Sequence, residues 1–325
     1  MKSLNLETEH LKSLNLFYNT NGIPTNLPTS NWIARESHNQ FIIKDNDNTS
    51  DIDIKLISLA NKIAGQIFGG IQKFYALRPS RGTMYAGIDS QVKISRSTFE
   101  KWASKQKSDE AHKLFYYFDF DNLVASLQNL IQESRMLFCR FYKILNQESF
   151  TLGETPLYPD GVMSASGLLV VDIFSTINHL FINLVSQLDL ITKIIVEINK
   201  LPTDFTKYPK LESNTITYGH YNKIKSITFD GPLYCKTEDL QLIITLRNEI
   251  IHNASFENNP KVYLAFENGL IIEKFILVPD TTKGIFDTFK NRSRFFDKDI
   301  KLNEILSPLI IGFWQKMETT IDTLL

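Results

Sequence analysis

The sequence predicts a mainly α-helical protein with small β additions, and three observations support this fold class. Apolar side chains recur every three or four residues from Asp51 onward, which is the spacing of one helix face. The stretch from Leu168 to Ile198 is apolar on most faces, as in the central helix of a bundle. Residues 261–278 have the pattern of a β-hairpin that turns at Asn268-Gly269.

The N-terminal half is expected to contain two regions. Residues 1–50 are rich in turn formers and predict an irregular extension with one short strand at 41–43. Residues 51–150 predict a helical region. Its expected elements are a helix from 51 to just before Pro79, a loop or small hairpin over 80–97, and helices at about 98–116 and 120–147.

The C-terminal half begins after a connector rich in Gly and Pro, residues 151–162. The elements expected there are a helix over 164–200, an irregular insertion over 202–236 with strands near 215–218 and 227–229, a helix over 238–255 capped by Thr237, and a closing helix over 302–324. A long irregular insertion is unusual in a plain helical bundle and is often functional.

Composition and charge limit the classes of function. The chain has 325 residues, with 35 basic and 36 acidic side chains, so it is not a protein that coats nucleic acid by bulk positive charge. Its two cysteines, Cys139 and Cys235, are far apart and fit a reducing compartment. The charged N-terminus lacks the apolar core of a signal peptide, and polar residues interrupt the stretch 168–198. We therefore expect a cytoplasmic protein without a membrane-spanning segment.

One segment of the predicted helix 238–255 combines residues that can carry chemistry: Arg247, Asn248 and His252. At 100° per residue, Asn248 and His252 share a polar strip and lie one turn apart. Arg247 falls near the middle of the predicted apolar face. That face consists of Leu240, Ile243, Ile244, Ile250, Ile251 and Ala254.

A guanidinium in an apolar face needs a partner, because an unpaired buried charge costs several kcal/mol. The partner of Arg247 can be a carboxylate such as Asp172 or Asp189, a backbone carbonyl, another subunit or a water-filled cleft. A second copy of the helix across a wet groove satisfies this need, and a sealed monomeric core does not. The position of Arg247 therefore predicts a two-fold dimer.

The sequence Arg247-Asn248, three residues, then His252 resembles the signature of the HEPN superfamily, whose hallmark is Arg, four to six intervening residues, then His. The strict match covers residues 247–252, and the architectural match covers 163–325. The resemblance implies a HEPN-like helical bundle over 163–325 and a metal-independent endoribonuclease that needs no cofactor and no metal. It further implies that His252 is the acid–base group, Arg247 the phosphate clamp and Asn248 the orienting residue.

The resemblance also implies partners. HEPN-type sites are built from two copies, so we expect a homodimer acting on RNA as a toxin or anti-phage defence effector, with an antitoxin or other defence-system protein as partner. The alternative is a non-catalytic helical module that binds nucleic acid, a nucleotide or a protein.

Two further features of the sequence bear on function. His179, in the middle of the long apolar helix, is expected to be a satisfied core histidine. The segments 221–225 and 290–296 mix basic and aromatic residues, and each is either an RNA-binding segment or a solvated turn.

Overall fold

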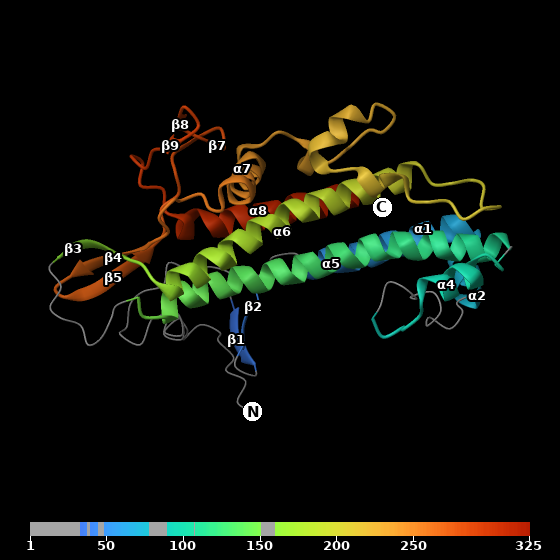
Figure 1. Cartoon of the computed structure of the whole chain (residues 1–325), viewed down its shortest axis with the longest axis horizontal. Coiled ribbons are helices and arrows are strands. Elements are labelled where there is room, and N and C mark those ends of the chain that lie inside the picture. The colour runs from blue at the N-terminus through green and yellow to red at the C-terminus, as the bar shows by residue number, and fades with distance from the viewer. Residues whose placement is uncertain (1–32, 38–39, 45–48, 78–89, 107, 151–159) are drawn as a thin grey trace. The chain divides into compact units, whose positions relative to one another are not determined.

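A computed structural model describes residues 33–37, 40–44, 49–77, 90–106, 108–150 and 160–325, and it is mainly helical with small antiparallel sheets (Figure 1). The α-helices are α1 (Thr49–Phe68), α2 (Ile71–Leu77), α4 (Arg96–Ala103), α5 (Asp109–Gln147), α6 (Leu168–Asn199), α7 (Glu238–Asn253) and α8 (Leu302–Asp322). The strands are β1 (Ile33–Ser37), β2 (Gln40–Lys44), β3 (Gly161–Ala165), β4 (Val262–Glu267), β5 (Leu270–Phe275), β6 (Thr281–Thr282), β7 (Ile285–Phe286), β8 (Thr288–Phe289) and β9 (Ser293–Arg294).

The chain divides into two compact units. Unit 1 contains the described residues of 1–49, 130–186 and 232–317, and unit 2 those of 50–129, 187–231 and 318–325. Both units therefore take residues from α5, α6 and α8. The units interleave along the chain, and the domain boundaries predicted at residues 50, 150 and 163 stay predictions.

The helices of the N-terminal half differ from the expected ones in two places. The helix expected up to Pro79 is interrupted, because Gly69 and Gly70 have φ values of 70° and 140°, which end α1 before α2 begins. The break expected near residue 118 does not exist, and α5 runs without interruption from Asp109 to Gln147. No Gly or Pro lies between the two helices that the sequence predicted there, so nothing stops the helix.

The sheet of unit 1 contains the predicted hairpin. Asn268 and Gly269 both have positive φ values, 52° and 74°, as a two-residue hairpin turn requires, and they join β4 to β5. Strand β3 adds to the other edge of β4, so the antiparallel order is β3-β4-β5. The strand predicted at 41–43 lies within β2, which pairs with β1.

The insertion between α6 and α7 contains 3₁₀ turns instead of the predicted strands. These turns are Glu212–Thr215, Tyr218–Lys223 and Pro232–Tyr234, and residues 227–229 form no strand. Two carboxylates of α6 in unit 2 hold the insertion: Glu197 accepts a hydrogen bond from Ser213 N, and Asp189 accepts one from Tyr218 N, both at 2.7 Å. The backbone donates to side chains here and not to a neighbouring strand.

The core of unit 1 is rich in large aromatic side chains, each of which stabilises the fold by about 1.5–3 kcal/mol on burial. They are Phe138, Phe141, Tyr142, Phe181, Phe313 and Trp314. The Tyr142 hydroxyl donates to Asn303 O at 2.7 Å, and Asn303 Oδ1 accepts from Ile276 N at 3.3 Å. These bonds join α5, the start of α8 and the segment after β5.

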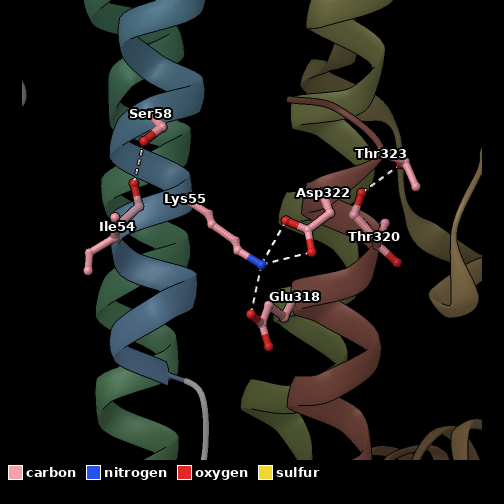
Figure 2. A network of polar contacts seen from close by, with 7 residues as sticks. All are labelled: Ile54, Lys55, Ser58, Glu318, Thr320, Asp322 and Thr323. Carbon is pink, nitrogen blue, oxygen red and sulfur yellow. Dashed lines mark hydrogen bonds and ion pairs between the residues drawn. The ribbon is translucent and has the colours of Figure 1, made fainter.

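In unit 2, α1 packs its buried side chains inward and binds the end of α8 through an ion-pair network (Figure 2). Lys55 Nζ lies 2.7 Å from the carboxylates of Glu318 and of Asp322. Two turns further along α1, Lys62 Nζ donates to the carbonyl oxygens of Leu324 and Leu325 at 2.8 Å. The amines of α1 thus hold the last turns of the chain.

Among the described residues, α6 is the one helix that is long and apolar enough to cross a membrane by length and composition. Within its most apolar 18-residue window, 56% is buried inside the protein. Polar side chains are buried along it as well, among them Asn183, Gln187 and Thr192. This burial is that of a core helix and is consistent with a soluble protein.

Candidate functional site

Helix α7 is positioned by the local signals that the sequence contains. The Thr237 side chain caps the first turn, accepting from Leu240 N at 3.5 Å, and Glu238 and Asp239 follow where the helix dipole favours acidic groups. The helix ends at Ala254, which has a left-handed backbone with φ 65°. Its carbonyl accepts from Asn178 Nδ2 of α6 at 3.3 Å. The helix predicted over 238–255 is confirmed.

The face that α7 buries is rotated relative to the predicted one. Its buried side chains are Leu240, Ile243, Leu246 and Ile250. Leu246 was not assigned to the apolar face and is completely buried, whereas Ile251 was assigned to it and is 49% exposed. Apolar residues extend around more than half of this helix, so the tertiary contacts decide which of them are covered.

Arg247 therefore lies at the edge of the buried face, and the prediction that it occupies the centre is wrong. Its side chain is half-buried, and Nη1 donates to Asn248 Oδ1 at 3.0 Å. The two carboxylates considered as partners are used elsewhere: Asp172 binds Arg140 at 2.7 Å, and Asp189 accepts from Tyr218 N. In the part of the chain that the structure describes, Arg247 has no carboxylate partner, so its charge is available to an anion at the surface.

Asn248 and His252 are both exposed on the polar strip of α7, one turn apart. Neither ring nitrogen of His252 has a hydrogen-bond partner among the described residues. Histidine is the side chain that most often transfers protons in catalysis. The structure thus brings Arg247 and Asn248 into contact and places His252 on the same strip, beside them along the helix.

Glu249, between these residues, has a structural role that the sequence did not reveal. Its carboxylate pairs with Arg294 of β9 and accepts from Asn253 Nδ2 at 2.8 Å. Arg294 also donates from Nη1 to Phe256 O at 2.8 Å. Arg294 is 11% exposed, so this pair is shielded from water and fixes the last turn of α7. No local signal links positions 45 residues apart.

His179 is not the core histidine that was predicted. Its side chain is 50% exposed, and Nε2 lies 3.2 Å from Glu133 Oε1 of α5. The first half of α6 presents one strip to solvent, on which Val171 is 59% exposed. The prediction failed because the long apolar stretch is covered on most of its faces but not on this one.

No group of three or more His, Cys, Asp and Glu side chains that could hold a metal ion occurs among the described residues. Comparison of the chain with family models, with curated proteins and with solved structures found no match. The chemical argument therefore depends on the side chains of α7 and their surroundings.

Proposed function

We propose that the chain is a metal-independent endoribonuclease of the HEPN type, with its site on the exposed strip of α7. The observation that carries the proposal is the state of three side chains. Arg247 has a charge without a carboxylate partner, Asn248 binds it, and His252 is exposed and unbonded among the described residues. Polar groups that serve the fold are normally paired, so groups left available are candidates for binding and chemistry.

These residue types fit RNA cleavage by the neighbouring hydroxyl. A neutral imidazole takes the proton of the 2′-OH, and O2′ attacks phosphorus. The bond from phosphorus to O5′ breaks, an imidazolium gives O5′ a proton, and the products are a 2′,3′-cyclic phosphate and a 5′-OH. The Arg247 fork stabilises the charge on the phosphate oxygens, and Asn248 holds the guanidinium or the scissile group in place.

One His252 supplies one half of an acid–base pair. We propose that a homodimer supplies the other half, with the two α7 helices lining one groove across a two-fold axis. The need for both an acid and a base supports the dimer, whereas the position of Arg247 at the edge of the apolar face does not require it. Ile251, 49% exposed between Arg247 and His252 on the helix surface, gives the groove an apolar contact for the second copy.

The biological setting we propose is that of a cytoplasmic toxin or anti-phage defence effector, restrained by an antitoxin or another defence-system protein. A free ribonuclease site on the surface needs such control in a cell that depends on its own RNA.

A second candidate function is a helical interaction module without catalysis. Ile251, which is 49% exposed beside the polar strip, supplies an apolar contact for a partner of such a module. In that case α7 is a dimer seam or binds nucleic acid or a nucleotide without cleaving it.

A matched pair of histidine variants distinguishes the two functions. We expect His252→Ala to lower the rate of RNA cleavage at least about a hundredfold, because it removes the proton-transfer group. His179→Ala removes another exposed imidazole from unit 1 and should leave the rate within about twofold. Circular dichroism should show both variants folded. Equal rates for wild type and His252→Ala, or no cleavage by wild type, would favour the interaction module.

A further inference from the structure

The hairpin formed by β8 and β9, residues 288–296, has a chemistry that neither the fold nor the α7 site uses. Its tip is a tight turn in which Arg292 N donates to Phe289 O at 3.1 Å, while Lys290 and Asn291 have left-handed φ values of 52° and 55°. The sequence of this hairpin contains three basic residues and no acidic one. Because Arg294 is paired with Glu249, Lys290 and Arg292 are the two cations that the hairpin has for a ligand.

The hairpin is fixed against α7 at the flank of the candidate site (Figure 1). Arg294 of β9 binds Glu249, and Glu249 lies three residues before His252, about 60° away around the helix. The neighbouring β6–β7 turn is held at the other end of α7. A side-chain carbon at Gly284, whose φ is 76°, would lie 2.3 Å from Glu238 O, so only glycine allows this close approach.

The face of the hairpin opposite Arg294 presents aromatic rings to solvent. Phe289 is 59% exposed and Phe295 is 47% exposed, whereas Arg294 is 11% exposed. Phe289 pairs with Ser293 in the β8–β9 ladder, and Phe295 directly follows the last residue of β9. These rings contribute little to the core, in contrast to Phe286 in β7, which is buried.

Two cations accompany these rings. Lys290 Nζ lies 5.4 Å from the centre of the Phe289 ring, and Lys290 and Arg292 are both exposed. The Arg292 side chain has no partner among the described residues. Exposed rings with cations beside them match an unpaired nucleic-acid strand, because bases stack on the rings and phosphates meet the cations. In a duplex the base faces are stacked on one another, so only the phosphates can contact the hairpin.

We propose that the β8–β9 hairpin binds single-stranded RNA and delivers it to the α7 strip. This inference rests on the proposed function for the direction of delivery, but the binding itself depends only on the hairpin. Phe289 and Phe295 stack on bases, and Lys290 and Arg292 contact the phosphates between them. The substrate class of the site is then an unpaired RNA segment, such as a loop or an open end.

The test measures binding separately from cleavage. In the full-length His252→Ala protein, the dissociation constant of a 5′-fluorescein-labelled 12-nucleotide oligouridine is measured by fluorescence anisotropy. We expect Phe289→Ala with Phe295→Ala to weaken binding at least about tenfold. We expect Lys290→Gln with Arg292→Gln to reduce the slope of log K against log salt by about 1.4, since two phosphate contacts are lost. A 12-base-pair RNA duplex should bind at least about tenfold more weakly than the single strand.

A control variant removes one exposed aromatic ring and one exposed amine elsewhere. Tyr75, 46% exposed in α2, and Lys101, exposed in α4, are changed together to Ala and Gln. This variant should bind like its parent. The hairpin proposal is overturned if both hairpin variants bind like the parent, if the control weakens binding as much, or if single strand and duplex bind equally.

The same measurements separate the two proposals. Binding that depends on the hairpin, together with wild-type protein that cleaves no RNA, leaves the hairpin proposal standing and contradicts the ribonuclease. Cleavage that depends on His252, together with hairpin variants that bind like the parent, does the reverse.

Discussion

The polar strip of α7 and the ion-pair network at the end of α8 differ in whether their charged side chains have partners of opposite charge. In the network of Figure 2, Lys55 lies 2.7 Å from the carboxylates of both Glu318 and Asp322. On the same helix, Lys62 donates to the carbonyl oxygens of Leu324 and Leu325. On α7, Arg247 has an amide as its partner and His252 has none among the described residues. The charges of the network are paired with opposite charges, and on our proposal those of α7 serve RNA binding and cleavage. The proposal thus gives the first region a role in stability and the second a role in function.

Replacing Arg247 tests the functional side of this comparison. We expect Arg247→Ala to lower the cleavage rate about a hundredfold, because a charge beside the phosphate is lost. Arg247→Lys should recover part of the rate, since it keeps the charge but not the planar fork. The free energy of unfolding should change by less than about 1 kcal/mol, because Arg247 forms no ion pair with the described residues. Rates are measured with an oligonucleotide substrate and stability with urea.

An arginine that serves the fold provides the matched control. Arg140 is bound to Asp172 at 2.7 Å, and Arg140→Ala should leave the cleavage rate within about twofold. If Arg140→Ala and Arg247→Ala lower the rate equally, the difference between paired and available arginines carries no functional meaning.

A mixed dimer sharpens the assignment of the two imidazoles. Chains of wild type and His252→Ala, carrying different tags, are co-expressed and the mixed species is purified. A composite site with one imidazole lacks either its acid or its base, so the rate per dimer should fall well below half of wild type. A rate of half or more would indicate that each chain has a complete site. A monomer by light scattering at working concentrations would also exclude the composite groove.

Replacing Lys55 tests the role of the ion-pair network in stability, and of the predicted effects it is the smallest. Lys55→Met keeps the aliphatic stem and removes the charge, and we expect a loss of about 0.5–1 kcal/mol in the free energy of unfolding because the site is partly exposed. The hydrogen bonds that Lys55 donates to the carboxylates of Asp322 and Glu318 raise the pKa of Lys55 above its ordinary value of 10.5. A raised pKa of an amine stabilises the folded state below the unfolded value. The difference between the two proteins should therefore be constant at neutral pH and disappear as pH rises through the folded-state pKa.

The cleavage rate of Lys55→Met should equal that of wild type. Asp322→Asn alone and in combination with Lys55→Met completes a double-mutant cycle, in which a coupling near zero would contradict the pairing. A fall in cleavage with unchanged stability would reverse the roles that the comparison assigns.

Local signals in the sequence were sufficient for individual elements. Thr237 and the acidic residues after it locate the start of α7, and Asn268-Gly269 locates the β4–β5 turn. The Gly69-Gly70 pair is a sequence signal for the break between α1 and α2, but the apolar spacing continues across it and predicted one helix. The strands expected near 215–218 did not form, because carboxylates of α6 took the backbone N–H groups of Ser213 and Tyr218.

Tertiary contacts decided what the sequence left open. Leu246 and Ile251 are equally apolar, and only the packing of α7 determines that the first is buried and the second exposed. The same rotation moves Arg247 from the centre of the apolar face to its edge. The link between Glu249 and Arg294 spans 45 residues, and no pattern in one sequence indicates it. The identity of the three candidate residues could be read from their spacing, whereas their surroundings could not.

The most direct test of the central claim is the chemistry of the ends that wild-type protein leaves on RNA in the presence of EDTA. Proton transfer by His252 and attack by the 2′-OH require no metal, so cleavage should continue at an undiminished rate and leave 2′,3′-cyclic phosphate and 5′-OH ends. Mass spectrometry of the products identifies both groups. Activity that disappears with EDTA and returns with magnesium, or products with 5′-phosphate ends, would contradict the assignment of α7 as the catalytic site.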